Sequence, residues 1–179
     1  MTEVSINKQA RLSEHFTLAE LCKTSVKTKD GNIPSHVAIE NLKRLTGWLE
    51  MLRDEYNKRY SLPLTPSHCN ATLCTFRSEK ERGNYEQPIV INSGYRSPQV
   101  NKLVGGVATS NHLTGCAVDI RVLGMEQLLR YAVILLDISD ESGEDFDELL
   151  IERNSKGTYW LHFAVRPEGN RRKIKLLEG

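Results

Sequence analysis

Residues 148–165 read ELLIERNSKGTYWLHFAV, a stretch that predicts a β-hairpin. Two runs rich in apolar residues, 148–153 and 158–165, flank the sequence Asn-Ser-Lys-Gly at 154–157. Runs of this length around a glycine-containing turn are typical of paired antiparallel strands. We therefore expect these two strands to lie side by side in a sheet.

The turn of this hairpin sets which side chains share a face. A three-residue turn over 155–157 would place Gly157 in the left-handed conformation that such turns require. Glu152 then lies opposite Trp160 and diagonal to His162, on the same face. A slip of one residue would move these groups to opposite faces of the sheet. The predicted register thus makes Glu152 a neighbour of His162.

Two further strands and two long helices are expected to complete the domain. Short apolar runs at 88–92 and 117–122 predict strands, and apolar residues at steps of three and four predict helices over 35–56 and 124–137. We expect an α+β fold: a single domain with a small, mainly antiparallel sheet and flanking helices. The clearest apolar stripe consists of Ala38, Leu42, Leu45, Leu49, Leu52 and Tyr56.

Local signals predict the shorter elements. Thr17 stands three residues before Glu20, the spacing of a capping box, and should begin a short helix. Ser97 followed by Pro98 predicts the start of a helical turn. The acidic stretch 140–145 is expected to be a solvated loop.

The domain is expected to span residues 13–166. Residues 1–12 are polar and predicted to be loose, and residues 167–179 form a basic C-terminal tail. Residues 62–87 are irregular in pattern and are interpreted as a long surface insertion. This insertion contains His68, Cys69 and Cys74, which we interpret as loop residues because no convincing fourth ligand for a metal accompanies them.

Composition excludes several classes of protein. The chain has 179 residues, 39% of them hydrophobic and 26% charged, which suits one globular domain and argues against disorder over most of its length. The formal net charge is +1, so the chain lacks the basic excess of a dedicated nucleic-acid binder. Arg171, Arg172, Lys173 and Lys175 are interpreted as part of a solvated tail, and we expect no nucleic-acid partner.

The expected location follows from similar considerations. No apolar run approaches the roughly 20 residues of a membrane-spanning helix. The first 16 residues contain no continuous apolar stretch, so we expect no conventional secretory signal and a cytosolic protein. We also expect a monomer. The four cysteines are too few and too scattered for a disulfide scaffold, and we expect reduced thiols.

Three residues form a candidate metal site. His112 precedes the predicted strand 117–122, Asp119 lies on it, and His162 lies on the second strand of the hairpin. Imidazole nitrogen and carboxylate oxygen both suit zinc, and a catalytic zinc needs three protein ligands with a fourth position open. The alternative is purely structural: Asp119 would form a salt bridge with Arg96 or Arg121, and both histidines would be hydrogen-bonded core residues.

A wider pattern surrounds these residues. SGYRS at 93–97, SNHLTGCAVD at 110–119 and WLH at 160–162 resemble the zinc D-Ala-D-Ala carboxypeptidase family, the M15 peptidases. EHFTLAEL at 14–21 and FDELLIER at 146–153 are similar to the family as well. The resemblance covers most of the chain outside the 62–87 insertion.

The resemblance implies a Hedgehog/DD-peptidase-like fold and a single zinc ion held by His112, Asp119 and His162. It implies hydrolysis of peptide bonds that involve D-amino acids in peptidoglycan, by carboxypeptidase or endopeptidase action. Such chemistry needs a carboxylate that accepts the proton of the attacking water. Related branches place this glutamate two or three residues before the last histidine, where this chain has Trp160 and Tyr159. Glu152 is therefore the candidate base.

Alternatives remain open for the other site residues. Glu152 can also be an ordinary strand-end carboxylate, and Glu148 is a weaker competitor for its role. The resemblance gives Arg96 a role in binding substrate or the transition state, whereas the alternative is a bond to a backbone carbonyl. Ser110 is a candidate for binding substrate or a metal ligand. Cys116 is interpreted as a small buried residue.

Two functional classes are compatible with this pattern. The first is a zinc metallopeptidase acting on cell-wall peptides, comparable to a phage endolysin. The second is a non-catalytic cell-wall-binding or phage structural module on the same scaffold. Because the substrate lies outside the cytoplasm, the first class requires release by lysis or by a phage or secretion system.

Overall fold

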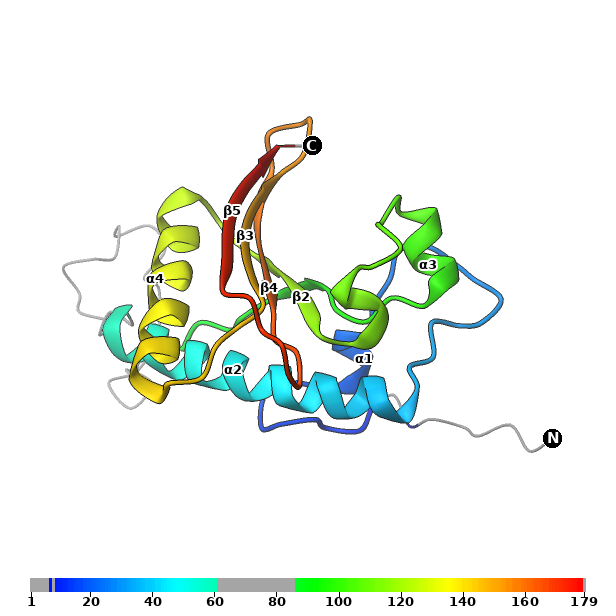
Figure 1. Ribbon diagram of the computed structural model, residues 1–179, viewed down its shortest axis with the longest axis horizontal. Helices are drawn as coiled ribbons and strands as arrows, with labels where there is room; N and C mark the ends of the chain where they lie inside the picture. Colours follow the sequence, from blue (N-terminus) through cyan, green and yellow to red (C-terminus); the bar gives the residue numbers. More distant parts are fainter. Residues whose placement is uncertain (1–6, 8, 61–85, 179) are drawn as a thin grey trace, which may run out of the picture.

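The computed structural model describes residues 7, 9–60 and 86–178 of the chain. The elements are, in chain order, α1 (Leu18–Leu21), α2 (His36–Tyr60), β1 (Ile91–Ser93), α3 (Pro98–Leu103), the 3₁₀ helix η3 (Asn111–Thr114), β2 (Ala117–Arg121), α4 (Met125–Ser142), β3 (Glu148–Arg153), β4 (Tyr159–Ala164) and β5 (Lys173–Glu178). In Figure 1, α4 and α3 lie on opposite sides of the strands, and α2 runs beneath them. The α+β prediction is confirmed.

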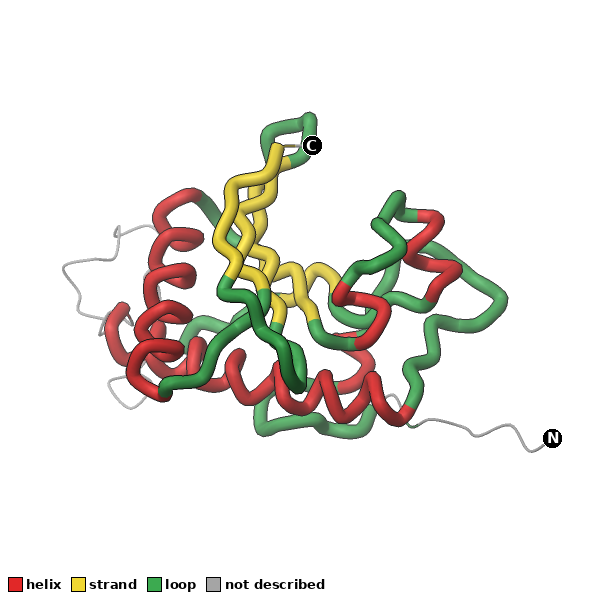
Figure 2. Tube along the Cα trace, in the orientation of Figure 1, coloured by secondary structure: helices red, strands yellow, loops and turns green. Residues whose placement is uncertain are grey.

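The strands form one mixed sheet in the order β1-β2-β4-β3-β5. All neighbouring pairs are antiparallel except β3 and β5, which are parallel. Figure 2 shows the long strands rising together beyond the helices. This arrangement leaves one face of β2, β4, β3 and β5 available to line a site.

The predicted hairpin is present with the predicted register. Glu152 is paired with Trp160, and Leu150 is paired with His162. The turn is closed by a hydrogen bond from the Asn154 N–H to the Thr158 carbonyl, 3.1 Å, and Gly157 has φ +83°. The left-handed glycine therefore fixes the register, as expected from the turn sequence.

The same register continues across the sheet. Asp119 of β2 is paired with His162 of β4, which is paired in turn with Leu150 of β3. Because side chains alternate between faces, Glu148 and Glu152 share the face of Leu150, one on each side of it. The pairing of β3 with β4 thus brings both glutamates near His162.

The long helices extend the predicted ranges. Helix α2 begins after Ser35, whose hydroxyl accepts a hydrogen bond from the Ala38 N–H at 3.2 Å, and its apolar stripe is buried. Trp48 of this helix packs against Phe163 of β4 with ring centroids 5.4 Å apart. The prediction of a loop over 140–145 is wrong for its first three residues, because α4 continues until Gly143 ends it with φ +71°.

The short elements agree with their capping signals. The Thr17 hydroxyl accepts from the Glu20 N–H at 3.3 Å, and the Ser97 hydroxyl accepts from the Val100 N–H at 3.3 Å. Strand β1 begins later than predicted, at Ile91 rather than at residue 88. Residues 88–90 are not part of the strand, although the Val90 carbonyl accepts a hydrogen bond from the Arg121 N–H at 2.8 Å.

The C-terminal tail contains a strand that we did not predict. Residues 173–178 form β5 and pair with β3 in parallel, so the expectation of a wholly solvated tail is wrong for them. The basic residues of this segment suit a solvated tail. The sequence Lys-Ile-Lys-Leu at 173–176 also alternates polar and apolar residues, as an edge strand does. Arg171 and Lys173 of the tail bind Glu148 at the start of β3, as described below.

Several expectations lie outside the described residues or are only partly covered. Residues 62–85 of the proposed insertion, including His68, Cys69 and Cys74, are not described. Within the N-terminal segment 1–12, Arg11 forms an isolated bridge with Thr17. None of the described helices is long and apolar enough to cross a membrane. The two described cysteines, Cys22 and Cys116, are both buried.

Candidate metal centre and active-site cleft

His112 is held by its own loop. It lies in η3, where the Ser110 hydroxyl accepts a hydrogen bond from the His112 N–H at 3.3 Å. The ring Nδ1 lies 2.6 Å from the Gly94 carbonyl oxygen, so Nδ1 must be the protonated nitrogen that donates. The other nitrogen, Nε2, therefore keeps a lone pair directed toward Asp119. This arrangement is the one that a metal-binding imidazole requires.

Two glycines allow this loop to pack closely. A Cβ atom on Gly115 would lie 2.5 Å from the Ala38 carbonyl oxygen of α2, and Gly115 has φ +73°. A Cβ atom on Gly94 would lie 2.3 Å from the Leu21 carbonyl oxygen of α1. The glycines of the SGYRS and SNHLTG motifs are thus needed for the backbone approach that places His112.

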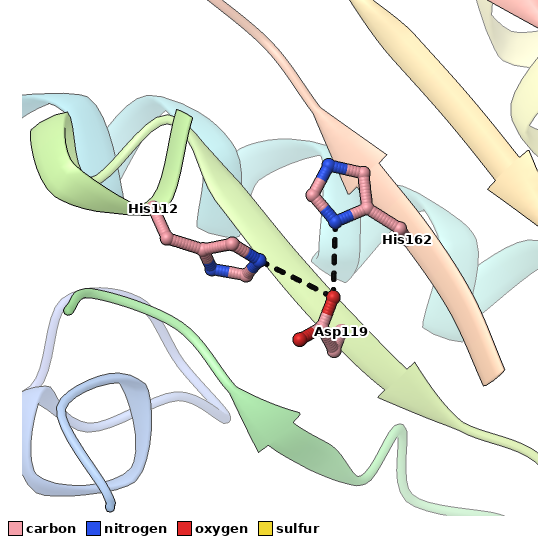
Figure 3. Close-up of side chains that lie close together, drawn as sticks. All are labelled: His112, Asp119 and His162. Atoms are coloured by element: carbon pink, nitrogen blue, oxygen red, sulfur yellow. Dashed lines mark hydrogen bonds and ion pairs between the residues drawn. The ribbon is translucent and has the colours of Figure 1, made fainter. Parts of the chain in front are cut away.

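Asp119 and His162 complete the cluster. They are directly paired across β2 and β4, and His162 Nδ1 lies 2.9 Å from Asp119 Oδ1. His112 Nε2 approaches the same oxygen from the loop at 3.3 Å (Figure 3). One ligand atom from each residue lies within 4.8 Å of the others, and all three side chains are buried. This spacing is compatible with one ion between them.

The electrostatics of the cluster favour a cation. Burial works to raise the pKa of Asp119, but His112 and His162 outweigh it and hold this pKa well below its usual range. Burial works to lower the pKa of His162, but Asp119 and Glu148 raise it to about 9. A buried carboxylate needs a compensating positive charge. Two imidazoles and one carboxylate are a donor set that fits zinc.

Arg96 binds the other oxygen of the same carboxylate. Its Nη2 forms an ion pair with Asp119 Oδ2, and its Nε donates to the Ser93 hydroxyl at 2.8 Å. The Arg96 N–H also donates to the His112 carbonyl at 3.0 Å. The structural alternative, a salt bridge between Asp119 and Arg96, therefore occurs together with the clustering of the histidines. Because Arg96 binds Asp119 Oδ2, Asp119 Oδ1 is the oxygen that faces the rings of both histidines.

The two glutamates on β3 have different surroundings. Glu148 Oε2 lies 3.6 Å from His162 Nε2, and its carboxylate accepts from Lys173 Nζ at 2.7 Å, Arg171 Nη2 at 2.9 Å and Asn111 Nδ2 at 3.0 Å. The contact with His162 and the hydrogen bond from Lys173 outweigh burial and hold the pKa of Glu148 well below its usual range. Glu152 is half-buried, and its side chain makes no hydrogen bond or ion pair with the part of the chain that the structure describes.

The cluster opens into a cleft of about 860 Å³. The face of the sheet forms one wall, and the segment from Val104 to His112 forms the other. The indole N–H of Trp160 is buried in the cleft wall and has no hydrogen-bond partner among the described residues. The predicted site residues that line the cleft are Arg96, Ser110, His112, Asp119, Glu152 and His162.

Sequence reasoning missed a polar network beside the cluster. Asp147 is fully buried and is bound by Arg171 through two bonds of 2.7 and 2.8 Å, by Asn111 at 2.7 Å and by Arg166 at 2.9 Å. The only local signal was an aspartate before an apolar strand, and its cationic partners follow about 20 residues later. Arg172 is similarly paired, with Asp140 and Asp145. Of the four basic tail residues, Arg171, Arg172 and Lys173 therefore form ion pairs.

Cys116 lies apart from the cluster. It is buried, and burial raises the pKa of its thiol. It lines a second cavity of about 380 Å³ that shares Ser110, Asn111 and Arg166 with the main cleft. Its position agrees with the interpretation as a small buried residue.

Comparison with known families agrees with this geometry. The model of the Peptidase M15 family matches residues 68–135, which include Arg96, His112 and Asp119. No curated protein matches the chain. The family match confirms the resemblance inferred from the sequence and is consistent with an M15-family peptidase. Peptidases of this family are generally zinc-dependent, in agreement with the ligand set of the cluster.

Proposed function

We propose that this chain, which carries a Peptidase M15 match over residues 68–135, is a zinc-dependent peptidase that hydrolyses peptide bonds involving D-amino acids in peptidoglycan. The observation that carries the proposal is the convergence of His112 Nε2, Asp119 Oδ1 and His162 Nδ1 on the wall of an open cleft. A structural cluster would not need to face a cleft large enough for a peptide.

The three residues have the features of a catalytic zinc site. Three protein ligands leave a fourth position, and the cleft gives that position access to water and substrate. A zinc ion bound there would supply Lewis acidity for a water molecule and for the scissile carbonyl. Gly94 orients His112 by accepting its Nδ1–H, and Arg96 holds Asp119 by its outer oxygen. Both contacts leave the ligand atoms free.

Glu152 is the proposed general base. It lies beside His162 on the cleft face of the sheet, and no ion pair with a lysine or arginine is seen for it among the described residues. Its carboxylate accepts the proton of the attacking water and passes it to the leaving amine. Glu148 is less suited to this role, because Lys173 and Arg171 stabilise its ionised form and lower its basicity.

Arg96 and Trp160 are proposed to contact the substrate. Arg96 uses Nη2 and Nε for Asp119 and Ser93, which leaves Nη1 for a substrate oxygen or the developing oxyanion. Trp160 lines the cleft beside Glu152, so its side chain offers a surface for the peptide. The Ser110 hydroxyl already caps His112, so its role is to hold the ligand loop at the cleft edge.

The test combines metal content with hydrolysis of defined muropeptides, followed by mass spectrometry of the products. The wild-type chain should bind one zinc ion and release peptide fragments. Glu152→Gln should keep the zinc and lose activity by about 10²–10⁴-fold. Glu141→Gln, at an exposed site on α4, is the matched control and should remain active.

Two results would reject the proposal. Absence of stoichiometric zinc would remove the metal centre, and full activity of Glu152→Gln would remove the base. Retained zinc and retained peptidoglycan binding without hydrolysis would instead favour the non-catalytic module. The fragment masses distinguish carboxypeptidase from endopeptidase cleavage.

A further inference from the structure

Three cationic side chains gather in one part of the cleft. Arg166, Arg171 and Lys173 all line it, and they face two carboxylates, those of Asp147 and Glu148. One positive charge therefore has no carboxylate of its own. The hydrogen bonds show on which side chain that charge is available.

Arg171 and Lys173 are already engaged. Arg171 binds Asp147 through Nε and Nη2, and its Nη2 also lies 2.9 Å from Glu148 Oε1. Lys173 Nζ donates to the same oxygen of Glu148 at 2.7 Å. An anionic ligand would have to break these bonds to reach either cation.

Arg166 is anchored differently. Its Nε lies 2.9 Å from both Asp147 Oδ2 and Asn111 Oδ1, so the base of the guanidinium is held by a fully buried carboxylate. Neither Nη1 nor Nη2 makes a hydrogen bond with any of the residues in 9–60 and 86–178. The side chain is 32% exposed and lines both the main cleft and the second cavity. Its two terminal nitrogens are thus open to a ligand.

We propose that Arg166 binds a carboxylate of the peptide substrate, an assignment that rests on the proposed peptidase function. The two terminal nitrogens of a guanidinium match the two oxygens of a carboxylate. Because Asp147 and Asn111 hold the group before substrate arrives, little conformational freedom is lost on binding. Arg166 is therefore a specificity residue for acidic peptides.

The position of Arg166 places this carboxylate on one side of the cleaved bond. Arg166 follows His162 by four residues, a span of roughly 13 Å in extended chain. It lies beyond Ala164, which is paired with Glu148, and so on the side of His162 opposite to Glu152. The recognised group is a C-terminal or side-chain carboxylate on that side of the scissile peptide bond.

The experiment compares three synthetic peptides. The parent ends in D-Ala-D-Ala and contains one D-glutamate, and the two others carry an amide in place of either the C-terminal or the side-chain carboxylate. Dissociation constants are measured by calorimetry with the full chain, zinc-loaded and zinc-free. The wild type should bind one of the amidated peptides at least about tenfold more weakly than the parent. The identity of that peptide shows which carboxylate is recognised.

Variants then assign the effect to Arg166. Arg166→Gln should bind the parent as weakly as the wild type binds the amidated peptide, so that discrimination disappears. Arg166→Lys, which keeps the charge but not the fork, should recover only part of it. Arg172→Gln removes an arginine that is paired with Asp140 and Asp145 outside the cleft, and should discriminate as the wild type does.

Each outcome decides the assignment. Equal binding of all three peptides by the wild type, or undiminished discrimination by Arg166→Gln, would overturn it. If Arg166→Gln does not fold, the wild-type comparison and Arg166→Lys still decide. Discrimination between the peptides without hydrolysis would contradict the peptidase function but support the carboxylate site at Arg166. Hydrolysis without discrimination would support the peptidase function but contradict the carboxylate site.

Discussion

Glu148 Oε2 lies 3.6 Å from His162 Nε2, while His162 Nδ1 lies 2.9 Å from Asp119 Oδ1. The imidazole therefore stands between two carboxylates, with Nδ1 toward the proposed metal and Nε2 toward Glu148. A carboxylate on the far nitrogen of a metal-binding histidine fixes its tautomer and makes it a better ligand. Lys173 and Arg171 hold Glu148 in position for this contact.

Replacing Glu148 should weaken metal binding. We expect Glu148→Gln to raise the zinc dissociation constant by roughly 10–100-fold, because the Nε2–H of His162 loses its charged partner. Competition with a chelator of known affinity measures this constant. Glu141→Gln on α4 is the control, and an unchanged constant in Glu148→Gln would show that the carboxylate does not orient His162.

Zinc should stabilise the folded chain through the three ligands. At a free zinc concentration 100 times the dissociation constant, the gain in the free energy of unfolding is about 2.7 kcal/mol. For a domain of this size that corresponds to roughly 5–10 °C in Tm. His112→Ala should remove the zinc-dependent shift. A shift of wild-type size in His112→Ala would place the ion elsewhere.

Gly115 should be more sensitive to substitution than a glycine with open surroundings. Both Gly115 and Gly143 have positive φ, +73° and +71°, so alanine costs about 1–2 kcal/mol of conformational energy at either site. Only at Gly115 would the new Cβ meet a backbone oxygen, that of Ala38 at 2.5 Å. Urea unfolding should therefore show a larger loss for Gly115→Ala than for Gly143→Ala.

The same pair of variants tests how the ligand loop is placed. Gly115→Ala should also reduce zinc affinity, since η3 and His112 must move away from α2. Gly143→Ala should leave the affinity unchanged. Equal losses of stability in the two variants would mean that the loop adjusts without cost.

Asp147 should make stability depend on acid pH. Burial works to raise its pKa, but Arg171, Asn111 and Arg166 outweigh burial and lower it. A carboxyl group with a lowered pKa stabilises the fold above its unfolded pKa, about 3.9. That contribution is lost as the pH falls from there through the lower folded-state pKa.

Asp147→Asn should reduce the dependence of the free energy of unfolding on pH in this acid range. At neutral pH the variant should be less stable by roughly 2–3 kcal/mol, below the value for a fully buried pair because both arginines are partly exposed. Urea unfolding between pH 2.5 and 7 measures both effects. The same slope in wild type and variant would exclude Asp147 as the titrating group.

Local sequence was sufficient to predict most of the helices and strands and the residues that cap the helices. The glycine at 157 determines the turn of the hairpin, and the turn determines that Glu152 pairs with Trp160. Capping by Thr17, Ser35 and Ser97 follows from interactions within four residues. Such contacts depend on neighbours in the chain, so pattern and spacing predict them. The clustering of His112, Asp119 and His162 was inferred from motifs that are themselves local.

The partners of the charged residues depended on the folded structure. Arg96 meets Asp119 across 23 residues, and Asp147 meets Arg171 across 24, and neither spacing has a periodic signal. Strand β5 pairs with β3 although its own side chains carry charge that also suits a solvated tail. A charge in the sequence has many candidate partners of opposite sign, and only packing selects one. For this reason the sequence predicted the candidate metal ligands, whereas the tertiary structure determined which carboxylates and guanidinium groups remain available beside them.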